Sequence, residues 1–221
     1  MVGTVPPVST VTTVPFPRRP LEASDQVRRW YENELGWPTV PGKPGSPVRL
    51  RVGPCFDVLD VPLEAGRAGL RHLAPDSPVA VQGDRMRLLL AAGSADEVPG
   101  VLDWLEWGSL PLGLAAIGEG GAMDAPRPPE PGAPSDVVRQ VPVPRGTDAW
   151  CPPVGRRDAL QGAAVWLRPP VPGREVEASL PTLSALGGGG DAPDLVRLLD
   201  TVATQCHRSR LRACAQPPAR R

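Results

Sequence analysis

Proline is the residue that most limits how this chain can fold, because 31 prolines are spread unevenly over its 221 residues. Proline has no backbone N–H and a fixed φ, so it interrupts both helices and central strands. Two stretches, MVGTVPPVSTVTTVPFPRRP (1–20) and PRPPEPGAPS (126–135), are too rich in proline to form either element. We therefore expect a disordered tail over residues 1–20 and an extended linker over 127–136.

Residues 21–126, between these proline-rich segments, alternate helical and strand patterns. Apolar residues at helical spacing predict helices over 24–36, 63–73 and from the capping pair Ser94 and Glu97 onward, where Pro99 shifts the start a few residues later. Strand patterns cover 37–40, 48–52, 55–61, 79–82, 85–91, 112–117 and a short segment ending at 126. The strands 79–82 and 85–91 are predicted to form a hairpin around Gly83 and Asp84.

These patterns predict an α/β (α+β) fold, with a compact core of roughly 100 residues in which a mixed sheet is flanked by helices. Residues 137–221 form a C-terminal extension with weaker signals. We expect strands over 137–143 and 163–167 and a helix over 192–211 that docks back on the core.

Overall charge and composition exclude several classes of protein. The 24 basic and 24 acidic residues balance, which argues against a strongly basic nucleic-acid-binding protein but not against a local basic patch. Lys43 is the single lysine, and this bias toward arginine, alanine, glycine and proline is typical of a GC-rich, actinobacterial genome. No apolar run approaches the roughly 20 residues of a membrane span, and the N-terminus lacks a basic leader pattern. We predict a cytoplasmic protein without membrane contact.

Cysteine and histidine give no sign of a metal site. The four cysteines have no CxxC spacing, so we expect reduced thiols. His207 stands beside Cys206 without the spacing of a closed zinc site, and His72 is expected on a helix, exposed or half-buried.

The segment FDVLDVP (56–62) places two acids inside an apolar strand, a pattern typical of metal ligands in phosphoryl transfer. Residues i and i+3 of a regular strand face opposite sides, so Asp57 and Asp60 do not share one metal unless a bulge realigns them. Position 62, on the face of Asp60, is proline. We expect Asp57 to be solvated and Asp60 to be an acid at a strand end, with both kept as candidate metal ligands.

The order of the predicted elements resembles the primase-polymerase (Prim-Pol) domain of bifunctional DNA primase/polymerases, in the degenerate form found in small actinobacterial proline-rich proteins. The phrases that carry this resemblance are YENELGWPTVPGKPG (31–45), FDVLDVP (56–62), QGDRMRLLL (82–90) and AIGEGGAMDAP (116–126).

The family's reaction uses two divalent metals held by three acids, and a histidine contacts the nucleotide phosphates. The resemblance places the acids at Asp60, Pro62 and near Ala115, and the histidine at Met86. With one acid of three retained, the resemblance implies a fold that has lost its catalytic groups and needs no cofactor.

Three functions follow from these observations. The first is a non-catalytic primase-polymerase-like protein that binds single-stranded nucleic acid or a protein partner. The second is an active DNA primase/polymerase, a nucleotidyltransferase whose Mg²⁺ or Mn²⁺ is held by a rearranged set of Asp57, Asp60 and either Asp84 or Asp124. The third is an interaction adaptor whose segments PFPRRP and PRPPEPGAP are read by partners in extended form.

Candidate contacts for a nucleic acid come from the predicted last helix. Arg208, Arg210 and Arg212 suit the negative end of a helix dipole, which alone explains them, and a phosphate-binding patch is the alternative. Trp104 and Trp107 are three residues apart, which predicts one shared helix face for core packing or, if exposed, for base stacking.

Overall fold

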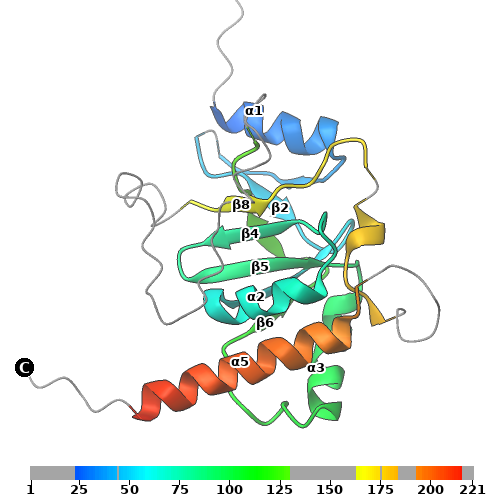
Figure 1. Ribbon diagram of the computed structural model, residues 1–221. Helices are drawn as coiled ribbons and strands as arrows, with labels where there is room; N and C mark the ends of the chain where they lie inside the picture. The colour runs from blue at the N-terminus through cyan, green and yellow to red at the C-terminus, as the bar shows by residue number, and fades with distance from the viewer. Residues whose placement is uncertain (1–22, 44, 130–162, 175, 184–192, 216–221) are drawn as a thin grey trace, which may run out of the picture.

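A computed structural model describes residues 23–43, 45–129, 163–174, 176–183 and 193–215 of the chain (Figure 1). It confirms the predicted α+β fold. The predicted N-terminal tail, most of the linker and the predicted strand over 137–143 lie outside the described residues. The elements are α1 (Ala23–Arg29), η1 (Trp30–Glu34), β1 (Thr39–Val40), β2 (Arg49–Arg51), β3 (Asp57–Pro62), α2 (Leu63–Gly69), η2 (Leu70–His72), β4 (Val79–Gln82), β5 (Arg85–Leu90), α3 (Ser94–Trp104), β6 (Ala115–Ile117), β7 (Ala122–Asp124), β8 (Val165–Arg168), η4 (Glu177–Ser179) and α5 (Leu195–Ala215).

The centre of the fold is a five-stranded antiparallel sheet with the order β6-β3-β5-β4-β8. Strands β4 and β5 form the predicted hairpin, whose turn uses Gly83 at φ 59°. Strand β3 lies between β6 and β5, so the segment FDVLDVP runs through the interior of the sheet. Strand β8 and helix α5, both from the region beyond residue 137, join this sheet and its core.

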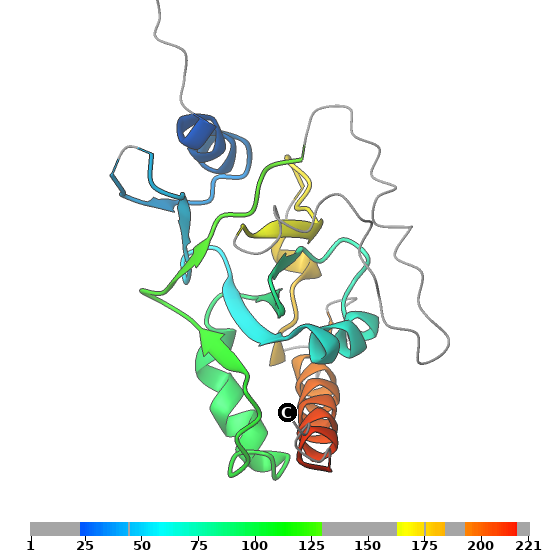
Figure 2. The same cartoon turned by 90° about the vertical axis from the view of Figure 1, so that its left-hand side faces the viewer.

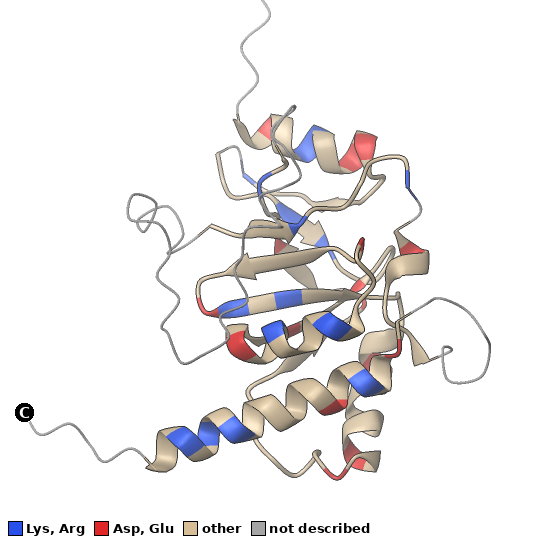
Figure 3. Ribbon diagram, viewed as in Figure 1, with Lys and Arg blue, Asp and Glu red and all other residues tan. Residues whose placement is uncertain are grey.

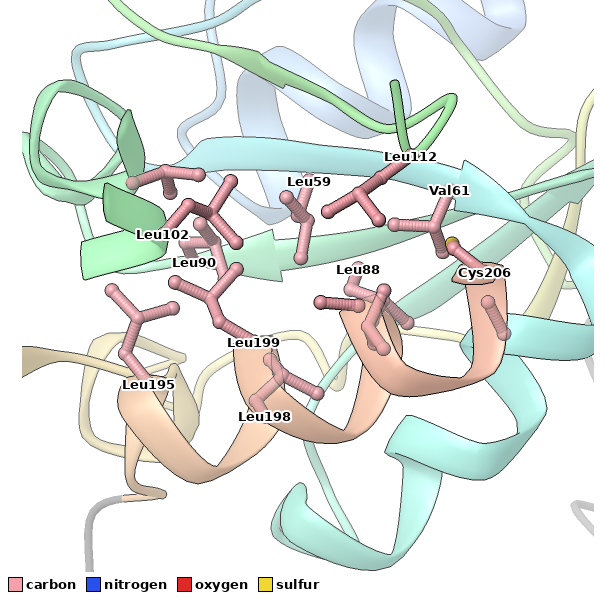
Figure 4. Close-up of a cluster of buried hydrophobic side chains, with 14 of the residues drawn as sticks. Leu59, Val61, Leu88, Leu90, Leu102, Leu112, Leu195, Leu198, Leu199 and Cys206 are labelled. Carbon is pink, nitrogen blue, oxygen red and sulfur yellow. The ribbon is translucent and has the colours of Figure 1, made fainter. Parts of the chain in front are cut away.

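One face of the five-stranded sheet is covered by helices α2, α3 and α5 (Figure 2). Leu59 and Val61 of β3 and Leu88 of β5 pack against apolar residues of α5, and all are fully buried (Figure 4). Burial of each such side chain contributes about 1.5–3 kcal/mol to stability. The predicted docking of the C-terminal helix is therefore confirmed, and α5 supplies Leu195, Leu198, Leu199, Val202, Ala203 and Cys206 to this core.

Helix α2 lies close to strand β5 and to helix α5 because it contains glycine at the two points of contact. A Cβ atom at Gly66 would stand 2.5 Å from Met86 Sδ, and one at Gly69 would stand 2.8 Å from Leu198 Cδ1. Glycine weakens a helix by roughly 1 kcal/mol relative to alanine. Its presence at positions 66 and 69 is therefore explained by the lack of room for a Cβ atom and not by helix propensity.

The opposite face of the sheet packs against a second, three-stranded antiparallel sheet with the order β1-β2-β7, and against the first helix. Tyr31 is fully buried between them. Its hydroxyl donates to the Pro126 carbonyl at 2.7 Å and accepts from Trp166 Nε1 at 2.9 Å. These two bonds tie the N-terminal helix both to the chain after β7 and to β8.

The structure corrects the predicted start of the third helix. Helix α3 begins at Ser94, and Pro99 lies inside it rather than delaying it. Gly93, in the left-handed conformation at φ 84°, occupies the capping position, and no side chain of its own segment caps the helix. The capping group comes from β3, as described below.

The chain has no described helix that is long and apolar enough to cross a bilayer. Of the cysteines, Cys55, Cys206 and Cys214 are described, and all three are free thiols.

Candidate functional site

Asp60 lies on the face of the central sheet that looks toward the three-stranded sheet. Residue alternation along β3 puts Asp57, Leu59 and Val61 on the helix-covered face and Asp60 on the other. The two acids of FDVLDVP therefore point in opposite directions, as their spacing predicts. No bulge is present between β3 and β5, since the register is continuous from Asp57 to Pro62.

Two arginines of the neighbouring strand hold the Asp60 carboxylate. Arg85 Nε donates to Asp60 Oδ1 at 2.5 Å, and Arg87 Nε donates to Asp60 Oδ2 at 3.3 Å. Arg85 also reaches the backbone carbonyls of Asp60, at 3.0 Å, and Gly113, at 2.7 Å. The Asp60 and Arg87 side chains are each only 15% exposed, which removes much of the solvent screening. The single carboxylate of Asp60 therefore forms ion pairs with two guanidinium groups and links β3 to β5.

The guanidinium of Arg87 does not use all of its hydrogen-bond donors. Its Nη1 atom is buried and has no hydrogen-bond partner among the described residues. With two arginines against one carboxylate, the cluster of Asp60, Arg85 and Arg87 carries a net positive charge. Such a cluster repels a divalent cation instead of attracting it.

The positions aligned with the family's catalytic groups do not meet in one place. Ala115 of β6 stands directly opposite Asp60 in the pairing of β3 with β6. Met86 lies on the other face of the sheet, fully buried in the helix-covered core. A histidine at Met86 would contact α2 and not a ligand beside Asp60.

Asp57 is not solvated, which corrects the expectation from the sequence. Only 1% of the residue is exposed, and its Oδ2 accepts from the backbone N–H of Ala95 at 2.8 Å. Asp57 thus caps the first turn of α3 from β3, where a negative group is favoured. Its other oxygen, Oδ1, is buried without a hydrogen-bond partner in the described structure.

Burial raises the pKa of the Asp57 carboxyl above its ordinary value, the Ala95 amide opposes this, and Asp96 and Glu119 add to it by repulsion. A carboxyl in this position stabilises α3. One of its two oxygens, Oδ2, is committed to this helix cap.

The alternative set of ligands is also dispersed. Asp84 is exposed in the β4–β5 turn, and Asp124 on β7 pairs with Arg49 at 3.6 Å and accepts from Gln82 Nε2 at 2.9 Å. Within the described residues, no three His, Cys, Asp or Glu side chains gather closely enough to hold a metal ion. The side chains present therefore do not fit two Mg²⁺ or Mn²⁺ ions.

A pocket of about 470 Å³ opens on another part of the molecule, and neither Asp57 nor Asp60 lines it. Its lining includes Trp37, Cys55 and Glu177. Burial and the nearby Glu177 carboxylate raise the pKa of the Cys55 thiol, so this cysteine is not an activated nucleophile.

The arginines predicted as nucleic-acid contacts lie on the part of α5 that extends beyond the core (Figure 1). Cys206 is the last buried residue of the helix, whereas Arg208, Arg210 and Arg212 are all exposed. Arg210 donates to the Pro111 carbonyl. Arg208 and Arg212 form no ion pair with a described carboxylate, so their charge is available to a ligand.

The two tryptophans do not share a helix face, contrary to the sequence prediction. Helix α3 ends at Trp104, and Glu106 adopts a left-handed conformation at φ 65° that turns the chain. Trp104 is 74% exposed. Trp107 instead contacts α5, where its Nε1 donates to Asp200 at 3.1 Å and its ring lies 5.8 Å from that of His207.

Sequence reasoning missed Arg85 and Arg87 as partners of Asp60. They flank Met86 in QGDRMRLLL, and their i, i+2 spacing places them on one strand face. The sequence is enough to predict that shared face. It does not predict the pairing of β3 with β5, which brings the two arginines to Asp60.

The chain matches no family model, no curated protein and no solved structure.

Proposed function

We propose that this protein is a non-catalytic module that binds single-stranded nucleic acid and has a primase-polymerase-like fold. The ion pairs of Asp60 are the observation that supports the absence of catalysis. Nucleotidyl transfer by two metals needs carboxylates that hold both ions beside the reacting phosphate. Here the one retained acid is neutralised by Arg85 and Arg87, and Asp57 is used to cap a helix.

The exposed end of α5 supports nucleic-acid binding. The segment from His207 to Ala215 contains three arginines and no acidic residue. Guanidinium groups bind phosphate through paired hydrogen bonds, and most of the affinity for nucleic acid comes from such phosphate contacts. Trp104, exposed near the loop that contacts α5, offers a surface on which a base can stack.

A template-dependent incorporation assay tests the absence of catalysis. The protein is incubated with a primed DNA template, labelled nucleotides and Mg²⁺ or Mn²⁺, and product is measured beside an active polymerase. We expect no product above background. Incorporation that is lost in the Asp60→Ala variant would refute the proposal, because it would show that Asp60 holds a catalytic metal.

The partner is tested separately. Binding of a fluorescent oligothymidylate at low salt supports nucleic acid. Absence of binding at low salt would favour the adaptor function. Of its proline-rich segments, PFPRRP and most of PRPPEPGAP lie outside the described residues.

A further inference from the structure

A second basic cluster lies where η2, directly after α2, meets α5. Arg71 Nε donates to His72 Nε2 at 3.1 Å, and Arg71 Nη2 donates to Thr201 Oγ1 at 3.4 Å. The Thr201 hydroxyl lies 2.8 Å from His72 Nε2. Arg197 stands one helical turn before Thr201 on α5, so its side chain projects on the same side of the helix.

This cluster carries positive charge that no described carboxylate offsets in full. Among the described residues, Arg71 bonds only to neutral acceptors, the imidazole of His72 and the hydroxyl of Thr201. Arg197 pairs with Asp194 at 3.4 Å, but its side chain is 78% exposed. An exposed pair of this kind is weak, so a stronger anion can compete for the guanidinium.

The cluster continues into the exposed arginines of α5. Arg197, Thr201, Arg208 and Arg212 follow one another at intervals of 4, 7 and 4 residues along α5, which places them on one helix face. Figure 3 shows basic residues along α5 and on the neighbouring segment from α2 to η2, on the side of the molecule that faces the viewer. One extended ligand can therefore touch both ends of this face.

We propose that Arg71, His72 and Thr201, with Arg197 beside them, form a phosphate subsite for the backbone of a single-stranded nucleic acid that continues along α5 to Arg208 and Arg212. This inference rests on the proposed function and adds the position at which a phosphate is held by several groups at once. Guanidinium and hydroxyl donors converge there, as phosphate recognition requires.

A nucleic acid fits this face better than an acidic peptide does. Leu211, which is 56% exposed, lies three residues after Arg208 and one before Arg212. An exposed apolar side chain beside phosphate-binding arginines offers a contact to a base, whereas a chain of carboxylates has no apolar group to meet it.

His72 reports on the subsite. In the structure Arg71 Nε donates to its Nε2 atom, so Nε2 acts as an acceptor and the ring is neutral. The Thr201 hydroxyl lies 2.8 Å from the same nitrogen. Burial lowers the pKa of His72, the charges of Arg71 and Arg197 lower it further, and Asp194 and Asp200 oppose them. An anion bound to both arginines offsets their charge, so binding raises the pKa of His72.

Nuclear magnetic resonance of the histidine rings tests the proposal, because the chain has only 2 histidines. The full chain is titrated with pH, alone and with a short oligothymidylate. We expect the midpoint of the His72 signal to rise when the oligonucleotide binds. His207, beside Arg208, reports independently on binding at the other end of the face.

Variants separate this subsite from the rest of the surface. We expect Arg71→Gln to weaken oligothymidylate binding about tenfold, as loss of a charge-assisted contact does, and Thr201→Val to weaken it less. Arg51→Gln, at an exposed position of β2, is the matched control and leaves affinity within about twofold.

The outcomes are distinguishable. If His207 responds while His72 and the Arg71→Gln affinity do not, the subsite is refuted and the proposed function stands. If no binding occurs, both fail. If poly-L-glutamate binds as tightly as oligothymidylate, the face is a general anion surface and the assignment to nucleic acid is wrong.

Discussion

Replacing Asp60 by asparagine separates its two possible roles by the sign of the stability change. Asparagine keeps the shape of the side chain but removes the negative charge, which leaves the guanidinium groups of Arg85 and Arg87 facing each other. An acid that serves as a metal ligand behaves in the opposite way, because the metal-free protein gains stability or is unchanged when a ligand carboxylate is neutralised.

The magnitude follows from the burial of the three side chains. Breaking a fully buried ion pair by removing one partner costs about 3–5 kcal/mol, because a charge is left uncompensated. Asp60 and Arg87 are 15% exposed and Arg85 is 32% exposed, so solvent screens part of this cost. We expect Asp60→Asn to lower the free energy of unfolding by roughly 2–3 kcal/mol.

Urea unfolding followed by circular dichroism measures this change, with a chelator present so that no metal contributes. The matched control is Asp84→Asn, an acid of the exposed turn of the same hairpin, for which we expect a change within about 0.5 kcal/mol. An Asp60→Asn protein as stable as the wild type would refute the ion-pair role. Stabilisation of the wild type, but not of this variant, by Mn²⁺ would establish Asp60 as a metal ligand.

Two further predictions concern Asp57 and the glycines of the helices. Because burial raises the pKa of Asp57 above its ordinary value of 3.8, the neutral carboxyl favours the folded state. The stabilisation from the neutral Asp57 carboxyl is complete below the pKa of Asp57 in the unfolded chain and is lost as pH rises through its pKa in the folded protein. Urea unfolding at a series of pH values should therefore show the stability of the wild type, relative to Asp57→Asn, falling between these two pKa values. A stability difference that grows with pH would contradict this. Gly66→Ala should destabilise by about 1–2 kcal/mol because its Cβ would stand 2.5 Å from Met86 Sδ, whereas Gly100→Ala in α3, with no atom within 4 Å of its Cβ, should stabilise by about 0.5–1 kcal/mol in thermal unfolding. Equal effects of the two substitutions would show that close packing does not determine residue 66.

Local patterns in the sequence predicted most elements, because helical and strand periodicities depend on neighbours in the chain. The helix that ends before Gly36, the hairpin at Gly83 and the apolar stripe of α5 follow from such signals. They also predicted that Asp57 and Asp60 face opposite sides, which depends only on strand alternation.

The errors arose where distant segments meet. The solvated position expected for Asp57 is wrong because its partner, the start of α3, lies 38 residues away in sequence and no local pattern records that contact. Trp104 and Trp107 diverge because Glu106 takes a left-handed conformation, which is uncommon outside glycine and is not signalled by its neighbours. The partners of Asp60 depend on the pairing of β3 with β5, which sets the chemistry of the site.

The salt dependence of oligothymidylate binding tests most directly whether this protein binds nucleic acid through its helix arginines. Each phosphate contact to a single strand contributes roughly −0.7 to the slope of log affinity against log salt concentration, so contacts from Arg71, Arg208 and Arg212 predict a slope of about −2. We expect the double variant Arg208→Gln/Arg212→Gln to reduce the magnitude of the slope to about 0.7 and to weaken binding at low salt. No measurable binding by the wild type at low salt, or a slope unchanged in the double variant, would contradict the account.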